Sequence, residues 1–379
     1  MKIVITGGGT GGHFYPLLAV IDAIKEECRE QKILEPYLYY TGPNPYNERE
    51  LYDRDIKFVH IPAGKKRINP KGMAVINNFI DIFRMGFGVC IALVKIFIIF
   101  PDVVFAKGGY TAFPTLFAAR ILGIPVVLHE SDSVPGRVNL WASKFAAKIA
   151  ISFAEAAQYF DSKKTAFTGQ PIRKELANPI KVGAYEYLNL NPELKTISIL
   201  GGSQGAQKIN DMIMTVLPEL VKKYQIVHQT GKLNFEVVKG MAKLSLEGST
   251  NPDRYKPVDY LNVLSMRMLG GISDIIISRA GSGIFEISAW GVPSILIPIT
   301  DSNGDHQRKN AFNYARSGAC EVIEESNLSG QILINEITRI LSNPTLQEKM
   351  RLAAKGFSDI HAAKTIAHEV LNIALSHEI

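Results

Sequence analysis

The sequence predicts an α/β fold of two doubly wound domains that face each other across a cleft. Strands and helices alternate along the chain, and each half opens with an apolar strand, a glycine-rich loop and a helix. The first opening runs from Ile3–Ile5 through Gly7–His13, and the second runs from Thr196–Leu200 through Gly201–Ala206. A chain of 379 residues is long enough for two such domains.

The first half is predicted to form one parallel sheet with helices between its strands. After the first loop, the apolar positions of Phe14–Glu30 fall on one helical face. A polar stretch follows at Asn44–Asp55, and a further helix begins at about Ala112. The predicted strands are Ile3–Ile5, Tyr37–Tyr40, Lys57–Ile61, Asp102–Ala106, Ile124–Leu128 and, as the last of this half, Lys148–Phe153.

The second half repeats the pattern after a hinge predicted at Thr168–Pro171. Its first helix should run to about Tyr224. Its predicted strands are Thr196–Leu200, Gln225–His228, Asp274–Ser278 and Ser294–Pro298. We therefore expect one domain at residues 1–168, a second at 169–357, and a C-terminal helix at 358–379 that could fold back over the first domain.

The composition is that of a globular protein, because 46% of the residues are hydrophobic and 21% are charged. The net charge of +6 suits phosphate-bearing substrates or an anionic membrane surface. No nucleic-acid-binding motif accompanies that charge, so we expect no nucleic-acid partner. Cys28, Cys90 and Cys320 share no metal or redox spacing, and we expect buried thiols in a reducing cytosol, with no signal peptide ahead of the first strand.

The first loop, Gly7–His13, has the composition of a phosphate-binding loop. Between a strand and a helix, glycine N–H groups and the helix N-terminus can approach a phosphate closely. Gly7, Gly9 and Gly12 also match the dinucleotide pattern G-x-G-x-x-G, but the second strand ends in Thr41–Asn44, without the carboxylate that would hold a ribose. A nicotinamide site also gives no reason for a histidine to close the loop. The loop therefore favours a phosphate ligand other than NAD.

Three polar loops of the first half follow predicted strands directly. They are Gly7–His13, Gly108–Tyr110 and His129–Glu130. Ligands of open α/β sheets bind at the carboxyl ends of the strands, where these loops should meet. The sequence therefore predicts a ligand site at this edge of the first sheet.

The stretch 73–100 is the most apolar part of the chain. Within it, Met85–Phe100 is apolar except for Lys95, and we expect this run to be too short and too interrupted to span a membrane. One interpretation is a buried helix. The other is a helix that touches a membrane, because basic residues flank an apolar stripe at helical spacing. The candidates for membrane contact are Lys65, Lys66, Arg67, Phe79 and Phe83.

The motifs GGGTGGHFYP, KGGY, GIPVVLHE, GGSQGA, SRAGS and DHQRKNA occur in this order, with QPIR at the predicted hinge. Together they resemble the MurG type of peptidoglycan glycosyltransferase, over residues 7–311. The resemblance implies a GT-B fold of two Rossmann-like domains and inverting transfer of N-acetylglucosamine from UDP-N-acetylglucosamine to a polyprenyl-diphosphate-linked muramyl-pentapeptide. It also implies no metal or other cofactor, and peripheral attachment to an anionic membrane surface at the cytoplasmic face of the bacterial cell membrane.

The resemblance also implies roles for the residues at matching positions. His13 would take the proton from the acceptor hydroxyl, a task that histidine suits at neutral pH. Glu130 would take part in catalysis, although His129 and Glu130 could instead form a structural pair. The implied donor-binding residues are Thr10, Gly11, Gly12, Asp132, Arg173, Ser203, Gln204, Leu261, Glu286, His306 and Gln307, and the implied acceptor-binding residues are Gly9, Gly109, Tyr110 and His129.

The chain departs from the family pattern at two places. It reads HESD where the family usually reads HEQN, so that Asp132 replaces an asparagine expected near the acetamido sugar. Glu286 lies seven residues after Arg279, where eight are expected for the glutamate that holds the ribose. The first departure bears on sugar specificity, and the second on the assignment of Glu286.

The spacing Asp53-Arg54-Asp55 matches the D-x-D with which glycosyltransferases of the other common fold hold a metal. It lies in a polar stretch ahead of a strand, so we interpret it as solvated charge and predict no metal. Three other functions stay open: a different UDP-sugar glycosyltransferase, a UDP-sugar epimerase or hydrolase, and a non-catalytic nucleotide-sugar sensor. An epimerase would need carboxylates placed for elimination, and a sensor would not need His13. The intact loops of the first half favour the transferase.

Overall fold

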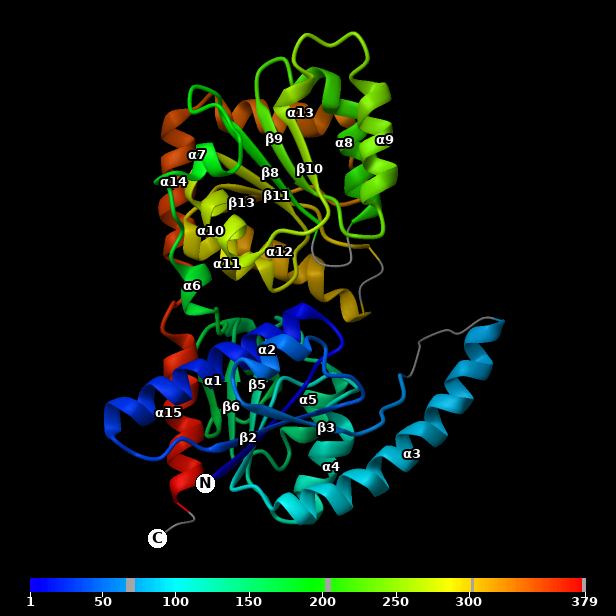
Figure 1. Cartoon of the computed structure of the whole chain (residues 1–379), viewed down its shortest axis with the longest axis vertical. Coiled ribbons are helices and arrows are strands. Elements are labelled where there is room, and N and C mark those ends of the chain that lie inside the picture. The colour runs from blue at the N-terminus through cyan, green and yellow to red at the C-terminus, as the bar shows by residue number, and fades with distance from the viewer. Residues whose placement is uncertain (66–71, 202–205, 301–302, 377–379) are drawn as a thin grey trace. The chain divides into compact units, whose positions relative to one another are not determined.

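The computed structural model describes residues 1–65, 72–201, 206–300 and 303–376. The chain divides into two compact units (Figure 1). Unit 1 comprises Met1–Arg173 and Ile360–Ile379, and unit 2 comprises Lys174–Asp359. The chain thus leaves unit 1 a few residues after the predicted hinge and re-enters it close to the predicted start of the C-terminal helix.

Unit 1 is built on a seven-stranded sheet in the order β3-β2-β1-β4-β5-β6-β7, in which all pairings are parallel. Its strands are β1 (Lys2–Thr6), β2 (Tyr37–Gly42), β3 (Ile56–His60), β4 (Val103–Ala106), β5 (Val126–Glu130), β6 (Lys148–Ile151) and β7 (Thr165–Phe167). The strand order reverses between β1 and β4, which is where ligands of doubly wound sheets bind. The apolar central strands are buried because helices cover both faces.

The prediction that Lys148–Phe153 ends the first sheet is wrong, because β7 follows as an edge strand. β7 is short and largely exposed, so it has no apolar run that a sequence pattern could reveal. The polar stretch Asn44–Asp55 also contains a helix, α2 (Glu48–Tyr52), whose first turn is capped by the side chain of Asn47 accepting a hydrogen bond from the N–H of Glu50.

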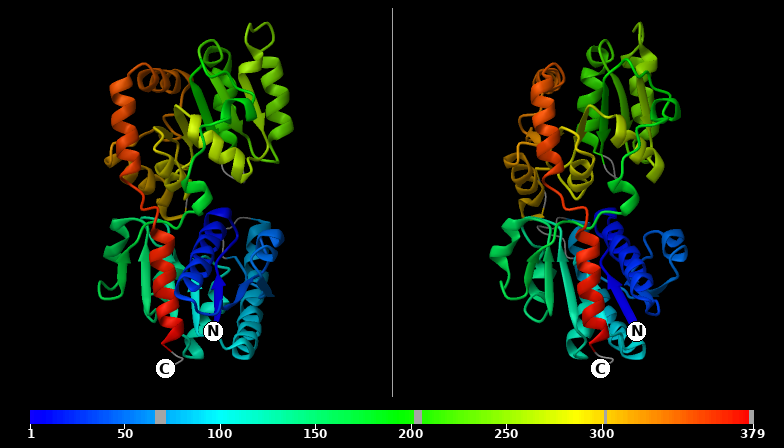
Figure 2. Two further views of the ribbon diagram at one scale, coloured as in Figure 1. Left: turned by 60° about the vertical axis from the view of Figure 1, so that its left-hand side comes forward. Right: turned by 90° about the vertical axis from the view of Figure 1, so that its left-hand side faces the viewer.

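The other helices of unit 1 cover the sheet and hold the C-terminal segment against it. They are α1 (Gly11–Gln31), α3 (Met73–Ile99), α4 (Phe113–Ile121), α5 (Arg137–Ala142), the 3₁₀ turn Ala154–Tyr159 and α15 (Ala362–Leu375). Helix α15 packs along α1, and both views of Figure 2 show it running beside the first sheet. Ile366, Val370 and Leu371 are buried there, and His368 pairs with Glu27 at 2.6 Å.

Helix α3 is 27 residues long and mostly exposed, so the buried-helix interpretation is wrong. Only a narrow stripe that includes Gly88, Ala92 and Ile96 is buried, and a side chain at Gly88 would collide with the carbonyl oxygen of Pro62. Its most apolar 18 residues have a mean hydropathy of 2.2 and are 22% buried. By length and composition alone α3 could cross a membrane, contrary to the expectation that the run is too short.

Unit 2 contains a six-stranded parallel sheet in the order β10-β9-β8-β11-β12-β13, which reverses between β8 and β11. Its strands are β8 (Thr196–Leu200), β9 (Gln225–Gln229), β10 (Tyr255–Val258), β11 (Ile275–Ser278), β12 (Ser294–Leu296) and β13 (Cys320–Val322). Its helices are α6 (Lys174–Ala177), α7 (Ala184–Tyr187), α8 (Gln207–Leu220), α9 (Phe235–Ser245), α10 (Val263–Ile272), α11 (Gly283–Trp290), α12 (His306–Arg316), α13 (Gly330–Leu341) and α14 (Pro344–Lys355), with 3₁₀ turns at Pro252–Arg254 and Asn303–Asp305.

The prediction of two doubly wound α/β domains is confirmed by these two sheets. Two local expectations are wrong, and two strands of unit 2 were not predicted. Helix α8 ends at Leu220 instead of about Tyr224. The unpredicted strands are β10, which contains Pro257, and β13, and both lie at an edge of the sheet. Cys28 and Cys320 are buried, but Cys90 lies exposed on α3.

Candidate functional site

The first glycine loop joins β1 to α1 and is fixed to the second glycine turn. Gly7 has a φ of +123°, and a side chain there would meet Lys107. The Thr111 hydroxyl accepts a hydrogen bond from the N–H of Gly8 at 3.0 Å and lies 3.3 Å from its carbonyl oxygen. The Tyr40 hydroxyl donates to the carbonyl of Gly7 at 3.4 Å. The two loops therefore form one rigid surface at the carboxyl edge of the sheet.

His13 lies in the first turn of α1, directly after this loop. Its Nδ1 is 3.0 Å from the hydroxyl of Thr10, which orients the half-exposed imidazole ring. The first turn of α1 contains no acidic residue, so its N-terminal dipole is not offset by a carboxylate there. His13 therefore stands beside a helix N-terminus that can favour an anion, and its role as a base stays a prediction.

A buried lysine lies beneath the two loops. Lys107 is 2% exposed, and its Nζ donates to the Ser131 hydroxyl, to Nδ1 of His129 at 2.6 Å and to Oε1 of Gln170 at 3.3 Å. Burial lowers the pKa of Lys107 to about 7, and the charges of Glu130 and Asp132 oppose that change. The amine is therefore a buried basic group with three hydrogen-bond acceptors and no carboxylate among these partners.

His129 is fully buried and uses both ring nitrogens within the protein. Its Nε2 lies 3.1 Å from the carbonyl oxygen of Gly169, which can only accept, so Nε2 carries the proton and Nδ1 accepts from Lys107. Burial and the charge of Lys107 hold the pKa of His129 well below its ordinary value, which keeps the ring neutral. His129 therefore bonds to Lys107 through Nδ1, and its role in acceptor binding stays a prediction.

Glu130 holds the loop that follows β5. One carboxylate oxygen accepts from the N–H of Asp132 at 3.0 Å, and the other accepts from the N–H of Gly136 at 3.1 Å and from Asn139 at 2.9 Å. Burial, and next the charge of Asp132, raise the pKa of Glu130. These bonds support the alternative that Glu130 has a structural task, while the adjacent Asp132 is partly exposed.

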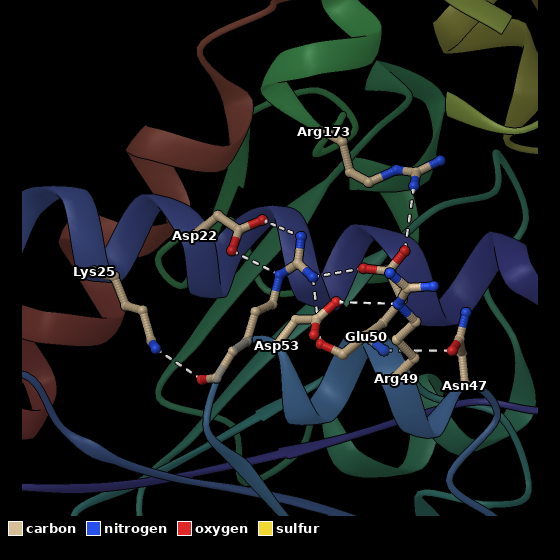
Figure 3. Close-up of polar contacts among 8 residues, drawn as sticks. Asp22, Lys25, Asn47, Arg49, Glu50, Asp53 and Arg173 are labelled. Atoms are coloured by element: carbon tan, nitrogen blue, oxygen red, sulfur yellow. Dashed lines mark hydrogen bonds and ion pairs between the residues drawn. The ribbon is translucent and has the colours of Figure 1, made fainter. Parts of the chain in front are cut away.

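Arg173, predicted as a donor contact, belongs to unit 1 in this structure. Its guanidinium lies over the ring of Tyr15 on α1, 4.1 Å from the ring centroid. Its Nη1 is 4.0 Å from Glu50 on α2 (Figure 3). Glu50 also accepts from Arg54 at 2.5 Å, and Arg54 binds both carboxylate oxygens of Asp22. This network places a cation beside the start of α1.

Residues of the Asp53-Arg54-Asp55 motif form ion pairs in and beside this network. Asp53 pairs with the exposed Arg49, and Arg54 is engaged with Asp22 and Glu50. Among the described residues no group of three or more histidines, cysteines or carboxylates could hold a metal ion.

In unit 2, a carboxylate holds the loops at the carboxyl edge of the second sheet. Glu325 is 4% exposed and binds Arg279 at 2.6 Å and Lys208 at 2.8 Å, and it accepts from the Thr300 hydroxyl at 3.0 Å. Burial alone would raise the pKa of Glu325, but Lys208, Arg279 and Thr300 hold it down at about 2. Arg279 also donates to the carbonyl of Ile297 at 2.9 Å. These bonds join the loops after β11, β12 and β13 to the start of α8.

The other predicted donor residues lie around this edge. Glu286 is in the first turn of α11, and His306 and Gln307 begin α12. Oε1 of Gln307 accepts from the N–H of Ile299 at 3.2 Å, and the N–H of Leu261 donates to Gln229 at 3.2 Å. Ser203, Gln204, Lys66 and Arg67 lie outside the described residues.

One acceptor candidate, Tyr110, and α3 line a common hollow in unit 1. Its volume is about 460 Å³, and it is bordered by Tyr110 of the second glycine turn and by Arg84 and Phe87 of α3. Gly9 lies opposite the ring of Tyr110, and Gly109 is the residue directly before Tyr110 in the chain. The hollow thus connects the exposed apolar helix with the surface formed by the two loops.

Sequence reasoning assigned no role to Lys107, Thr111 or Glu325. Lys107 was part of a quoted motif, and a lysine between a buried strand and a glycine turn was a signal that could have been used. Thr111 and Glu325 gave no such signal, because their partners lie at Gly8 and at Lys208, Arg279 and Thr300, far away in the sequence.

Comparison with known families gives a consistent result. Residues 3–151 match the glycosyltransferase family 28 N-terminal domain, and residues 196–366 match the glycosyltransferase family 28 C-terminal domain. A UDP-N-acetylglucosamine--N-acetylmuramyl-(pentapeptide) pyrophosphoryl-undecaprenol N-acetylglucosamine transferase from Natranaerobius thermophilus is 36% identical over 373 residues, which cover 97% of this chain and 98% of that protein. The enzyme of the same name from Lactiplantibacillus plantarum is 34% identical over 374 residues, covering 97% and 98% of the two chains.

Solved structures agree on the fold. The crystal structure of Acinetobacter baumannii MurG has a TM-score of 0.71 and 25% identity, over 98% of this chain and 100% of that one. A UDP-GlcNAc 2-epimerase from Neisseria meningitidis, bound to UDP-GlcNAc, has a TM-score of 0.65 but only 17% identity, over 98% and 100% of the chains, and so shares the fold alone.

The likeness to named transferases is therefore closer than the likeness to epimerases, and the alternatives from other function classes are not favoured. The chain belongs to glycosyltransferase family 28 and, within it, to the family of MurG-type N-acetylglucosaminyltransferases.

Proposed function

We propose that this enzyme transfers N-acetylglucosamine from UDP-N-acetylglucosamine to the C4 hydroxyl of undecaprenyl-diphosphate-linked N-acetylmuramyl-pentapeptide in peptidoglycan synthesis. The observation that carries the proposal is the match at 36% identity along 97% of the chain to an enzyme named for this reaction. The first glycine loop with His13 at its end supplies the chemistry that such a reaction requires.

In the proposed mechanism His13 removes the proton from the acceptor hydroxyl as its oxygen attacks the anomeric carbon. The bond from that carbon to the UDP oxygen breaks, UDP leaves with the electron pair, and the configuration at the carbon inverts. Thr10 orients His13 through the contact at 3.0 Å. The loops of unit 2 are proposed to hold the UDP diphosphate as negative charge builds on it.

The test is to incubate the purified full chain with UDP-N-acetylglucosamine and the lipid-linked acceptor, and to follow the disaccharide lipid and UDP. We expect transfer, and we expect EDTA to leave the rate unchanged, because the proposed mechanism uses protein groups alone. No transfer to this acceptor would overturn the proposed function. Activity lost with EDTA and restored by Mg²⁺ or Mn²⁺ would contradict only the metal-free mechanism.

We also propose that α3 attaches the enzyme to the cytoplasmic face of the bacterial cell membrane. Phe79 and Phe83 are 62% and 64% exposed, and their rings meet edge to face at a centroid distance of 5.0 Å. Large exposed apolar surfaces on a folded unit typically mark membrane or protein contacts. Because one stripe of α3 packs against unit 1, attachment along the membrane surface fits this helix better than insertion across it. The hollow at Tyr110 would admit the lipid-linked acceptor from that surface.

Changing Phe79 and Phe83 together to serine should weaken binding to anionic phospholipid vesicles by at least about tenfold, since each buried phenylalanine contributes about 2 kcal/mol. Turnover on the full lipid acceptor should fall, whereas a water-soluble short-chain acceptor should be used nearly as well as before. Leu352→Ser, which removes a side chain 63% exposed on α14 of unit 2, is the matched control. Unchanged vesicle binding in the double variant would place the docking surface elsewhere.

A further inference from the structure

Lys107 is a buried cation without a role in the mechanism above. Its Nζ contacts His129 and Ser131, the two neighbours of Glu130 in the chain. Its backbone N–H donates to the carbonyl of Thr6 at 3.0 Å, directly before the first glycine loop. Lys107 therefore joins two parts of the edge: its amine contacts the loop after β5, and its backbone contacts the end of β1, directly before the first glycine loop.

Two carboxylates occupy the same loop after β5. Glu130 is buried and Asp132 is partly exposed, and the N–H of Asp132 donates to Glu130 at 3.0 Å. Two negative charges beside a loop that binds a diphosphate would repel it.

We propose that Lys107 offsets the negative charge of Glu130 and Asp132, so that the neighbouring first glycine loop can hold the diphosphate of the acceptor. Lys107 is then a positioning residue that acts through the electrostatics of the loop and does not touch the substrate. The proposal rests on the proposed function, because it takes the acceptor diphosphate as the anion.

Lys107 acts on its surroundings through its positive charge and not only through its hydrogen bonds. His129 offers only an acceptor toward Lys107, because Gly169 fixes its proton on Nε2. The three neutral acceptors around Nζ can stabilise an ammonium group but do not cancel its charge. Its positive field therefore extends to the carboxylates and to the loop. Glu130 and Asp132 favour the charged form of Lys107 and raise its pKa against the effect of burial.

The test is a double-mutant cycle on the KM of the acceptor, measured with saturating UDP-N-acetylglucosamine. Lys107→Met should raise the acceptor KM by about tenfold, the size of one charge interaction in a partly buried site, with little change in the donor KM. In the Asp132→Asn background, the same Lys107→Met change should raise the acceptor KM at least threefold less, because one of the two carboxylates is gone.

Lys148→Met is the matched control. Lys148 lies on β6 of the same sheet and pairs at the surface with Glu369 at 3.1 Å, so its loss should leave both KM values unchanged. An equal effect of Lys107→Met in both backgrounds would overturn the charge proposal and leave a structural lysine. An unchanged acceptor KM in Lys107→Met would overturn it as well. Both outcomes presuppose an active wild type, so neither is confused with failure of the proposed function.

The pH dependence supplies a second measurement. The ratio of the acceptor KM of Lys107→Met to that of the wild type should be largest near pH 6 and fall toward one near pH 9, as Lys107 loses its proton. The other titratable groups that face it are His13, His129, Glu130 and Asp132. Of these, Glu130, whose pKa burial raises to about 7, interacts with Lys107 and also contributes to the ratio. A ratio independent of pH would contradict the proposal.

If thermal melting shows that Lys107→Met does not fold, the single variant Asp132→Asn tests the charge proposal instead. Without the charge of Asp132 the pKa of Lys107 should fall further, so the rise of acceptor KM with pH should begin at lower pH than in the wild type. An unshifted profile would then overturn the proposal.

Discussion

Both sheets carry ionisable side chains at their carboxyl edges, but the partners of these side chains differ between the two sheets. At the edge of the first sheet, Lys107 and Glu130 are buried among neutral partners, and burial moves the pKa of each toward neutrality. At the edge of the second, the side chain of Glu325 is 4% exposed and bound to two cations, and its pKa falls to about 2. Partners, and not burial alone, thus decide the direction of the shift.

This difference matches the tasks proposed for the two edges. Groups that titrate near neutral pH suit the unit that carries the proposed base, where proton transfer occurs. Charges that stay fixed at all physiological pH values suit the unit whose loops are proposed to hold a nucleotide diphosphate. Three changes test this comparison.

The largest expected effect is at the first edge. His13→Ala should lower turnover by at least about a hundredfold, since a general base contributes that much or more, and should leave UDP affinity nearly unchanged. Steady-state rates and calorimetry with UDP measure the two quantities. Turnover close to that of the wild type would remove His13 from the proposed mechanism.

At the second edge, Glu325→Gln should lower the free energy of unfolding of unit 2 by about 3 kcal/mol, because Arg279 would be left with its buried charge uncompensated. For a unit of this size the melting temperature should fall by roughly 6–12 °C. Glu324→Gln is the matched control, because the adjacent Glu324 pairs with the exposed Arg308 and should change the stability by less than about 1 kcal/mol. Equal melting temperatures for the two variants would mean that the Glu325 cluster is not a stabilising contact.

The smallest expected effect is in the pH dependence of stability, where the two carboxylates should act in opposite directions. The pKa of Glu325 is depressed from 4.5 to about 2, so its contribution is present above pH 4.5 and is lost as the pH falls toward 2. The pKa of Glu130 is raised above 4.5, so its contribution is present below pH 4.5 and is lost as the pH rises toward neutrality. Melting temperatures of the wild type, Glu130→Gln and Glu325→Gln between about pH 3 and pH 8 measure both slopes, and slopes of the same sign would contradict the comparison.

The fold was largely predictable, because its signals are local. Apolar runs such as Ile3–Ile5 and Thr196–Leu200 mark buried parallel strands wherever they occur, and a glycine loop after such a strand marks its carboxyl end. The strands that were missed, β7, β10 and β13, are short and lie at sheet edges, where pairing with neighbours substitutes for an apolar pattern. The missed helix α2 is also short.

The candidate site was predictable in its location but only partly in its bonds. The place of His13 after the first loop follows from the sequence, and the structure agrees with it. The environment of Lys107 does not follow, because His129, Ser131 and Gln170 come from β5, the loop after it and the segment after β7. Likewise, the contact of Arg173 with Tyr15 links residues that are far apart in the chain.

The sequence by itself determined the alternation of strands and helices, the two glycine loops, the position of His13 and the family of the enzyme. These depend on residue type and spacing, which a chain carries before it folds. The tertiary structure was needed to show that α3 is exposed, that Arg173 belongs to unit 1, that Lys107 is buried among neutral partners, and that the side chain of Glu325 is bound to cations. Burial and charge pairing depend on which strands become neighbours, so the same residue type can be solvated, titrating or permanently charged according to the fold around it.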